Sequence, residues 1–428
     1  MSEKTLKPFE GKLSGVIEIP GDKSISHRAV IFGSLAKGIT KVTNFLDGED
    51  CLRTVNAFRE MGVTIQEDGT SLVIESEGIS GLSEPKQPLD FGNSGTTTRL
   101  MLGILSGLPF FTTIYGDASL SKRPMDRVVN PLRQMGSIID GRNDGNLLPL
   151  SIRGSKLHPI DYTLPVKSAQ VKSAILLAGL LADGETRVTE TTPTRNHTEN
   201  MLKAFGADIT SDGYTTTIRG KNNLHATNVH VPGDISSAAF FLVAGTIVPD
   251  SSIHLKNTGL NNTRTGIIEV LQKMGADIVI ENERSVSGEK IGDIHISYSS
   301  LKGITIEGNI IPTLIDEIPI IALLATQAEG TTIIKDAEEL RVKETDRITA
   351  VADVLNTLGA DITPTKDGMI VKGKTQLHGG NIASYDDHRI AMMGAIASLI
   401  TTNEVVIDDI SCISISYPDF FRDLESLK

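Results

Sequence analysis

The 428-residue sequence predicts an α/β protein of two domains, each built from three similar repeats. Three observations lead to this prediction: the length of the chain, a glycine motif that recurs after helix-like segments, and a series of apolar helices. One hydrophobic core rarely grows beyond roughly 250–300 residues, so two domains are expected. We place the first domain at residues 20–230 and the second at residues 1–19 plus 231–428.

The glycine motif occurs five times. In each copy a segment with apolar residues at helical spacing ends in an apolar residue and a glycine, and a short alternating run follows. The glycines are Gly62, Gly136, Gly206, Gly275 and Gly359. This pattern is typical of a helix that is closed by a glycine and followed by a strand.

Six apolar helices alternate with these motifs. Each follows a strand end and a capping residue, and each is apolar nearly all round, as helices buried in a core are. They are expected near residues 26–36, 97–106, 169–181, 236–246, 317–328 and 388–400. Six copies of about 70 residues divide most simply into two domains of three. We assign the strand-like stretch Val16–Ile19 to the second half.

Composition excludes several classes of protein. With 41 Lys and Arg against 53 Asp and Glu, the net charge of -12 argues against nucleic acid as a partner. The longest apolar stretch, near residues 174–182, is shorter than the roughly 18–20 residues that span a bilayer. Residues 1–15 lack the apolar run of a signal peptide. We therefore expect a cytoplasmic protein with no membrane partner.

The cysteines and histidines of the sequence show no spacing that predicts a metal site. Cys51 and Cys412 are the only cysteines, too few for a disulfide framework, and this agrees with a reducing compartment. The nine histidines show no His-Glu-x-x-His or other metal spacing. We expect neither a metal nor a cofactor.

Basic residues gather at expected helix starts in both halves, despite the acidic total. Lys23 and Arg28 lie in the first turn-helix junction, Arg195 precedes a helix, and Arg389 opens the last apolar helix. Exposed cations there oppose the helix dipole at about 0.3–1 kcal/mol each, and a bound anion reverses the sign. The recurrence predicts a small polyanionic ligand held between helix N-termini of the two domains. For each segment taken alone, an ordinary capped helix with solvated basic residues remains an alternative interpretation.

Four further segments carry candidate ligand-binding groups, and each also has an ordinary structural interpretation. Gly92–Arg99 suits close approach of an anion, and an ordinary N-cap turn is the alternative. Ser121–Arg127 holds three cations around a proline, or is a solvated loop. Ser168 and Gln170 can bind ligand hydroxyls, although capping explains Ser168 equally well. Thr194–Glu199 contains His197, which we expect to be a local hydrogen-bonding residue.

Acidic residues mark the second half. Asp316 and Glu317 precede a very apolar helix, where they are either caps or, when desolvated, a base. Glu338–Arg347 alternates in charge, and an exposed salt-bridged helix is its usual interpretation.

Five motifs carry a family resemblance, and they occur in the order Pro-Gly-Asp-Lys-Ser-Ile-Ser-His-Arg, Gly-Asn-Ser-Gly-Thr, Lys-Arg-Pro-Met, Arg-Val-Lys-Glu-Thr-Asp-Arg and Asp-His-Arg-Ile-Ala-Met. Together they resemble the bacterial 5-enolpyruvylshikimate-3-phosphate synthases over essentially the whole chain. The resemblance implies a two-domain inside-out α/β barrel of the enolpyruvyl transferase type, with six βαβαββ repeats around buried helices. It also implies a monomeric transferase of the shikimate pathway, which makes aromatic amino acids and is the target of glyphosate.

The resemblance further implies a reaction and a site. The enolpyruvyl group of phosphoenolpyruvate would pass to the 5-hydroxyl of shikimate 3-phosphate through a tetrahedral intermediate, with release of phosphate. The site would lie in the cleft between the domains. Implied for phosphoenolpyruvate are Lys23, Gly95, Arg123, Gln170, Arg347 and Arg389. Implied for shikimate 3-phosphate are Lys23, Ser24, Arg28, Ser168, Gln170, Arg195, Asp316 and Lys343. The implied catalytic residues are Asp316 as the base, and Glu344 with Lys23 for proton transfer at the methylene carbon.

Two other functions stay open. A UDP-N-acetylglucosamine enolpyruvyl transferase, a related enzyme, has a reactive cysteine before its Arg-Pro, and residues 118–122 here contain none. In a non-catalytic anion-binding repeat protein, Asp316 and Glu344 would be helix caps. Two positions depart from some family members: Ala169 stands in place of a second serine, and Ile415 in place of a lysine.

Overall fold

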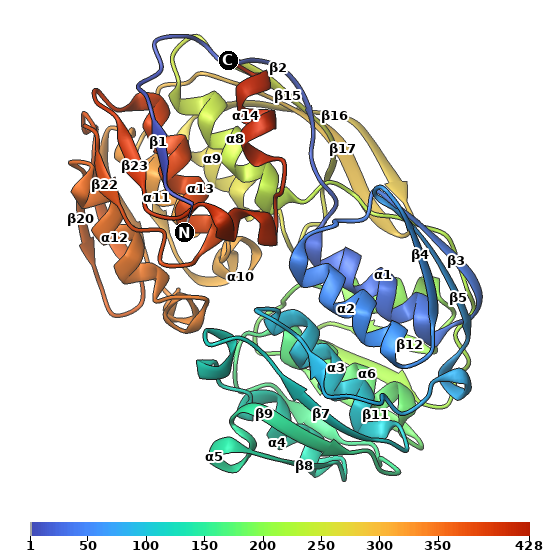
Figure 1. Ribbon diagram of the computed structural model, residues 1–428. Helices are drawn as coiled ribbons and strands as arrows, with labels where there is room; N and C mark the ends of the chain where they lie inside the picture. Colours follow the sequence, from blue (N-terminus) through green and yellow to red (C-terminus); the bar gives the residue numbers. More distant parts are fainter. Residues whose placement is uncertain (1) are drawn as a thin grey trace. The chain divides into compact units, whose positions relative to one another are not determined.

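The computed structural model describes residues 2–428 and divides into two compact α/β units (Figure 1). The first-half unit holds Gly21–Val231 together with Val286–Glu289. The second-half unit holds the residues up to Pro20, Pro232–Ser285 and Lys290–Lys428.

Three buried helices form the centre of the first-half unit: α1 (Lys23–Leu35), α3 (Gly95–Gly107) and α6 (Ala169–Leu181). They match three of the predicted apolar helices. Helix α3 packs against α6 so closely that a Cβ atom on Gly103 would lie 2.3 Å from the carbonyl oxygen of Ala174. Only glycine fits there, because that oxygen belongs to the backbone and cannot move aside.

Three buried helices also form the centre of the second-half unit: α8 (Ile235–Ile247), α11 (Ile318–Thr326) and α13 (His388–Ala397). Every residue of α8 is buried, and the three helices pack against one another. A 3₁₀ turn, Ser398–Ile400, continues α13. All six predicted apolar helices are therefore confirmed, with most ends within about three residues of expectation. Short helices α5 (Arg142–Gly145), α10 (Ile311–Leu314) and α14 (Phe420–Ser426) complete the α-helices outside the glycine motifs.

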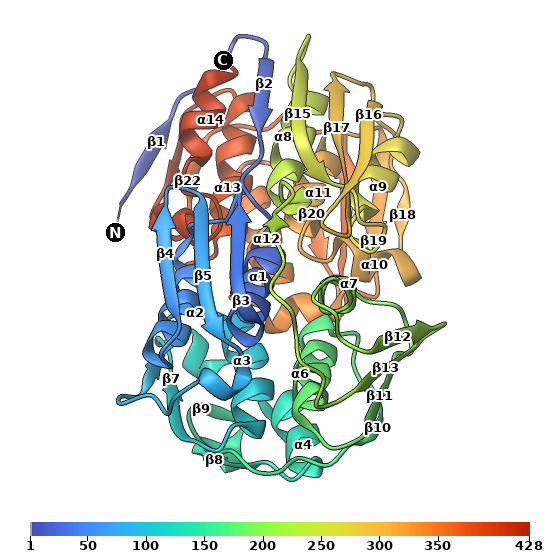
Figure 2. The ribbon, with the colours of Figure 1, turned by 90° about the vertical axis from the view of Figure 1, so that its right-hand side faces the viewer.

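Three four-stranded sheets surround the buried helices of the first-half unit (Figure 2). Their orders are β14-β3-β5-β4, β6-β7-β9-β8 and β10-β11-β13-β12, and each combines one parallel pair with two antiparallel pairs. The strands are β3 (Lys37–Thr43), β4 (Thr64–Asp68), β5 (Ser71–Glu77), β6 (Leu89–Asp90), β7 (Phe111–Tyr115), β8 (Ile138–Gly141), β9 (Leu147–Arg153), β10 (Asp161–Thr163), β11 (Glu185–Thr189), β12 (Ile209–Asp212), β13 (Thr215–Arg219) and β14 (Val229–His230).

The second-half unit repeats this arrangement with the sheets β16-β17-β15-β2, β18-β19-β21-β20 and the three-stranded β1-β23-β22. Strands from the start of the chain complete two of them, since β2 pairs in parallel with β15, placing Ile17 opposite Leu255, and β1 pairs with β23. The strands are β1 (Lys4–Leu6), β2 (Ser14–Glu18), β15 (Ser252–Gly259), β16 (Asp277–Val286), β17 (Glu289–Ser297), β18 (Thr305–Ile306), β19 (Gly330–Ile334), β20 (Asp361–Pro364), β21 (Met369–Gly373), β22 (Gly380–Ile382) and β23 (Val405–Ile407).

The glycine motifs close the outer helices α2 (Glu49–Glu60), α4 (Asp126–Gln134), α7 (His197–Ala204), α9 (Gly266–Met274) and α12 (Arg347–Thr357). All five glycines have positive φ, between 86° and 98°, in the left-handed region that favours glycine. At Gly62, for example, the N–H donates to Arg59 and the next N–H reaches back to Phe58. A strand follows each glycine, so the predicted helix-glycine-strand pattern is confirmed.

Among residues 2–428, no single helix has both the length and the apolar character needed to cross a membrane. The segments Gly308–Leu314 and Ile318–Thr326 pass that test only as a pair, and the break between them bends by 109°.

A buried histidine on α1 makes the stability of the first-half unit depend on pH. The Nδ1 atom of His27 lies 2.8 Å from the hydroxyl of Thr54 on α2, and Nε2 has no hydrogen-bond partner among the described residues. Burial, together with the positive charges of Lys23 and Arg28, holds the pKa of His27 well below its ordinary value of 6.5. His27 therefore stays neutral in the folded protein at pH values where an unfolded chain would protonate it.

We expect this histidine to make the protein sensitive to acid. Below pH 6.5 the unfolded chain binds a proton that the folded chain does not, so the free energy of unfolding falls as the pH falls. One such proton corresponds to about 1.4 kcal/mol per pH unit. His27→Asn keeps a donor toward Thr54 and should reduce the slope between pH 6 and pH 5 by about this amount in urea denaturation. Equal slopes for both proteins would contradict the assignment.

Candidate active site

The predicted substrate residues of the first-half unit lie at the starts of its buried helices. Lys23 and Ser24 open α1, Gly95 opens α3, and Gln170 lies in the first turn of α6. Ser94 and Ser168 accept a backbone N–H of the next turn, at 3.2 and 3.4 Å, and so cap α3 and α6. Capping therefore accounts for both serines, and their helix starts present further N–H groups to which an anion can bind.

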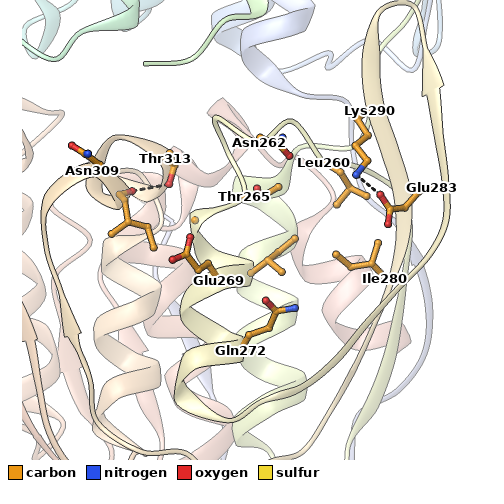
Figure 3. A pocket seen from close by; sticks show the side chains of 13 residues that line it. Leu260, Asn262, Thr265, Glu269, Gln272, Ile280, Glu283, Lys290, Asn309 and Thr313 are labelled. Atoms are coloured by element: carbon orange, nitrogen blue, oxygen red, sulfur yellow. Dashed lines mark hydrogen bonds and ion pairs between the residues drawn. The ribbon is translucent and has the colours of Figure 1, made fainter. Parts of the chain in front are cut away.

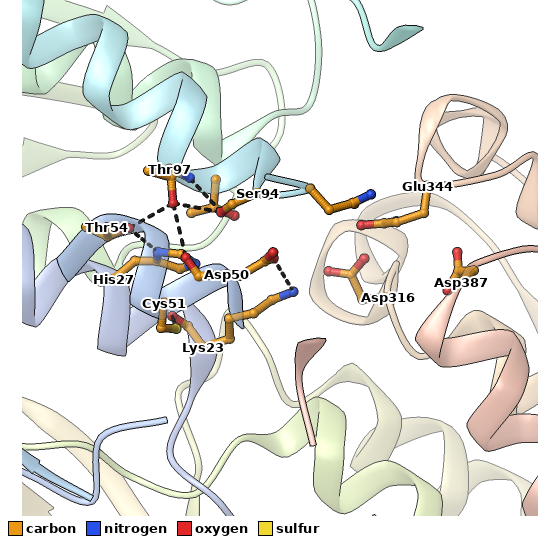
Figure 4. Close-up of polar contacts among 12 residues, drawn as sticks. Lys23, His27, Asp50, Cys51, Thr54, Ser94, Thr97, Asp316, Glu344 and Asp387 are labelled. Carbon is orange, nitrogen blue, oxygen red and sulfur yellow. Dashed lines mark hydrogen bonds and ion pairs between the residues drawn. The ribbon is translucent and has the colours of Figure 1, made fainter. Parts of the chain in front are cut away.

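Lys23 is held by a carboxylate of the same unit. Its Nζ lies 3.2 Å from Oδ2 of Asp50 in the first turn of α2, and the lysine side chain is 17% exposed (Figure 4). Asp50 was not predicted from the sequence. Its nearest signal was an acidic residue at a helix start, which is so common that it points to no function.

Gly95 lies against two guanidinium groups. A Cβ atom on it would come within 3.0 Å of Nη1 of Arg99 and 3.3 Å of Nη1 of Arg123. Arg99 donates to Oε1 of Gln170 at 2.7 Å, and Arg123 donates to Oδ1 of Asn93 at 2.6 Å. Three predicted residues, Gly95, Arg123 and Gln170, are thus brought together around Arg99. The sequence analysis did not select Arg99, although its position one helical turn after Gly95 is the signal that could have found it.

Arg28 is almost fully buried, and its donors are engaged within the unit. It donates to the hydroxyl of Thr198 at 2.7 Å, to the carbonyl of Ser24 at 2.8 Å and to the hydroxyl of Ser173 at 2.9 Å. Burial lowers the pKa of Arg28 to about 10, although Glu199 opposes the shift. The guanidinium therefore keeps its charge at neutral pH and fixes the start of α1.

A buried lysine that was not predicted from the sequence connects α6 to α7 and to the segment before α7. Lys172 is 1% exposed and pairs with Glu190 at 2.8 Å and with Glu199 at 2.7 Å. Glu190 accepts the backbone N–H of Thr194 at 3.1 Å and also its hydroxyl. Half-buried Arg195 follows directly in the chain, so this triad supports the backbone from which Arg195 extends.

His197 is a hydrogen-bonding residue, as expected, but its partner is not local. Its Nδ1 lies 2.9 Å from Oε1 of Glu289, 92 positions away in the sequence. The prediction of a local partner was wrong because strand β17, which begins at Glu289, lies far along the chain from α7.

Arg347 is the centre of the second-half cluster. It is 1% exposed, and its guanidinium contacts Asp387 at 2.7 Å, Glu344 at 2.7 Å and Asp316 at 3.2 Å. Burial alone would lower the pKa of Arg347, but Asp387, Glu344 and Asp316 outweigh it and raise the pKa above its ordinary value. The expectation of an exposed salt-bridged helix over Glu338–Arg347 was wrong. The segment is a 3₁₀ turn at Glu338–Val342, and Asp346 then caps a new helix that begins with the buried arginine.

Asp316 is paired with two cations. Its Oδ1 lies 3.1 Å from Nζ of Lys343 and 3.2 Å from Nη1 of Arg347. The neighbouring Glu317 makes no capping bond to α11 and instead accepts from the hydroxyl of buried Ser236. Glu317 therefore does not cap α11 through its side chain, and the capping alternative was wrong for this residue. The contacts of Asp316 stabilise its ionised form, which is the form that a general base needs.

Arg389 lies at the start of α13, where Asp387 caps the helix by accepting its backbone N–H at 2.9 Å. Asp387 therefore serves α13 and Arg347 together. The structure thus brings Asp316, Lys343, Glu344, Arg347 and Arg389 into one region of the second-half unit.

A hollow of about 560 Å³ lies elsewhere in that unit, along α9 and the β16–β17 hairpin (Figure 3). Thr265, Gln272 and Thr313 are among the residues that line it, and none of the predicted site residues does. Its Lys290 and Glu283 pair with each other, which reduces the net charge it offers a ligand. Within residues 2–428, no group of three or more His, Cys, Asp or Glu side chains is arranged to hold a metal ion.

Known proteins resemble this chain over nearly its whole length. Residues 9–424 match the family described as EPSP synthase (3-phosphoshikimate 1-carboxyvinyltransferase). A 3-phosphoshikimate 1-carboxyvinyltransferase of Oceanobacillus iheyensis is 66% identical over 427 residues, which cover 100% of each chain. One of Geobacillus kaustophilus is 58% identical over 97% of this chain and 98% of its own.

Solved structures give the same result. An EPSP synthase from Acinetobacter baumannii is 46% identical, with a TM-score of 0.89 and coverage of 99% of this chain and 98% of its own. The enolpyruvyl transferase NikO from Streptomyces tendae is 19% identical with a TM-score of 0.79, which supports the fold alone. These matches confirm the predicted inside-out α/β fold of the enolpyruvyl transferases. The chain belongs to the EPSP synthase (3-phosphoshikimate 1-carboxyvinyltransferase) family.

Proposed function

We propose that this protein transfers the enolpyruvyl group of phosphoenolpyruvate to the 5-hydroxyl of shikimate 3-phosphate and releases phosphate. It is a transferase of the shikimate pathway, which leads to the aromatic amino acids. The observation that carries this proposal is full-length membership of the family, with each family motif located at a helix start or in the Arg347 cluster. We also propose that it acts as a cytoplasmic monomer. The two free, buried cysteines agree with a reducing compartment.

The first-half residues would supply most of the shikimate 3-phosphate contacts, with residues 20–230 acting as one domain. Ser24, Ser168 and Arg195 stand at helix starts or directly before one, where hydroxyl, backbone N–H and guanidinium donors suit a phosphate. Gln170 offers a carboxamide to ligand hydroxyls or to phosphoenolpyruvate. Arg28, whose donors already serve Ser24 and Ser173, would contribute mainly charge and support.

Phosphoenolpyruvate would be bound by Lys23, Gly95 and Arg123 from this domain and by Arg347 and Arg389 from residues 231–428. Its phosphate and carboxylate carry several negative charges, and four cationic side chains balance them. Gly95 would let the helix start approach the ligand without a side chain in the way.

The residues then account for the chemistry. Protonation of the methylene carbon, with Glu344 and Lys23 handling the proton, leaves C2 electron-poor. Asp316 takes the proton of the 5-hydroxyl as the oxygen bonds to C2, which gives a tetrahedral intermediate. Loss of a methyl proton and departure of phosphate restore the double bond on the product. Lys343 supports shikimate 3-phosphate and keeps Asp316 ionised.

The two alternatives fit less well. A transferase acting on UDP-N-acetylglucosamine would need the reactive cysteine that residues 118–122 lack. A non-catalytic repeat protein would use Asp316 and Glu344 as caps, whereas both pair with Arg347.

A phosphate-release assay tests the proposal. We expect phosphate release that requires phosphoenolpyruvate and shikimate 3-phosphate together, with none when UDP-N-acetylglucosamine replaces the second substrate. Release with the sugar nucleotide would favour the related transferase. No release from folded protein with either acceptor would refute the transferase assignment.

Replacing the proposed base should slow turnover with little change in the fold. Asp316→Asn keeps the shape and removes the basicity, and loss of a general base costs about 10² to 10⁴ in rate. Asp346→Asn is the matched control, because this nearby aspartate caps α12 and asparagine caps equally well. Steady-state turnover of both purified variants decides the matter, and a D316N rate within tenfold of the parent protein would exclude Asp316 as the base.

A further inference from the structure

A buried chain of hydroxyl groups joins the starts of α1, α2 and α3 in the first-half unit (Figure 4). The hydroxyl of Thr97 lies 2.8 Å from that of Thr54 and 2.7 Å from that of Ser94. It also lies 3.3 Å from the backbone carbonyl of Asp50, and Thr54 in turn contacts Nδ1 of His27. Thr54, Ser94 and Thr97 are all fully buried, so water does not compete for these bonds.

The direction of each bond follows from the chemistry of its partners. A carbonyl only accepts, so the single proton of the Thr97 hydroxyl goes to Asp50. The two remaining lone pairs of Thr97 then accept from Thr54 and from Ser94. Because Thr54 has used its proton, it accepts from His27, whose proton must sit on Nδ1. This tautomer leaves Nε2 as the unprotonated nitrogen, which agrees with its lack of a partner among the described residues.

Thr97 therefore joins the start of α3 directly to α2 and, through Thr54 and His27, to α1. All the hydrogen-bonding capacity of its hydroxyl is used. On one side it holds the backbone of Asp50, whose carboxylate holds Nζ of Lys23. On the other side it holds Ser94, the cap of α3, which directly precedes Gly95. The next residue, Thr98, is equally buried, but its hydroxyl bonds only the carbonyl of Ser94, within its own helix.

We propose that the Thr97 hydroxyl is a positioning group for the phosphoenolpyruvate site, because it fixes the Lys23–Asp50 pair relative to the Ser94–Gly95 turn. This inference rests on the proposed function, which places Lys23 and Gly95 against phosphoenolpyruvate. Thr97 touches no substrate and acts only through these two neighbours. Removing its hydroxyl leaves the shape of the core nearly unchanged but leaves Asp50, Thr54 and Ser94 each without one partner.

The test compares Thr97→Val with Thr97→Ser and Thr98→Val. Valine has nearly the shape of threonine without the hydroxyl, and serine keeps the hydroxyl. T98V removes an equally buried hydroxyl that bonds the backbone carbonyl of Ser94 and none of the side chains of the network. In the phosphate-release assay, T97V should raise KM for phosphoenolpyruvate about tenfold, the scale of one misplaced hydrogen bond. KM for shikimate 3-phosphate should rise much less, by about twofold at most, because Lys23 is only one of several residues implied for that substrate. T97S should stay within threefold of the parent protein on both constants, and T98V should leave both unchanged.

A second measurement does not depend on turnover. Acetylation of Lys23 by a small reagent, followed by mass spectrometry on the folded proteins, should be several times faster in T97V than in the parent protein and T98V. If the parent protein released no phosphate, the proposed function would fail, and labelling would still decide whether Thr97 fixes Lys23. Equal labelling of Lys23 in T97V and T98V would overturn the inference. So would unchanged KM values in T97V, or equal rises in both constants.

Discussion

A buried cation at the start of a helix needs a nearby negative charge, because burial removes water and the helix dipole adds to the repulsion. The protein supplies such charges from other elements of the same unit. Asp50 serves Lys23, Glu190 and Glu199 serve Lys172, and Asp387 with Asp316 and Glu344 serves Arg347. The positions of these cations, and hence the geometry that a ligand meets, depend on these ion pairs.

The pairs also explain why an acidic chain can bind anions. The net charge of -12 is an average over the molecule, whereas the cations at the helix starts form local basic sites. Lys23, Lys172 and Arg347 are each held by carboxylates. The free backbone N–H groups of the helix starts offer further donors to an anionic ligand. The same carboxylates take on chemical roles in the proposed reaction: Asp316 and Glu344, which hold Arg347, are the proposed proton-transfer groups. In the proposed reaction, structural support and catalysis would thus use the same side chains.

The sequence predicted what repeats locally and missed what pairs at a distance. The spacing of apolar residues and the turn glycines located six buried helices and five glycine-closed helices. Each of these signals is contained in a stretch of about fifteen consecutive residues. The partners of the cations are 27 positions away for Lys23 and 40 for Arg347, and no local pattern reveals them. Lys172 was read as part of an apolar helix, and Glu338–Arg347 as a solvated one, because charge spacing does not show whether a side chain is buried. The family motifs supplied predicted roles for the residues that pattern alone left ambiguous.

The claim that these helix starts form an anion site is tested most directly by calorimetric titration of the protein with shikimate 3-phosphate and, in parallel, with shikimate. The two ligands differ only in the phosphate. Two charge-assisted hydrogen bonds to that group, at about 1.5–3 kcal/mol each, correspond to at least about a hundredfold in Kd. The account predicts that shikimate 3-phosphate binds tighter than shikimate by at least this factor. Equal dissociation constants for the two ligands would contradict it.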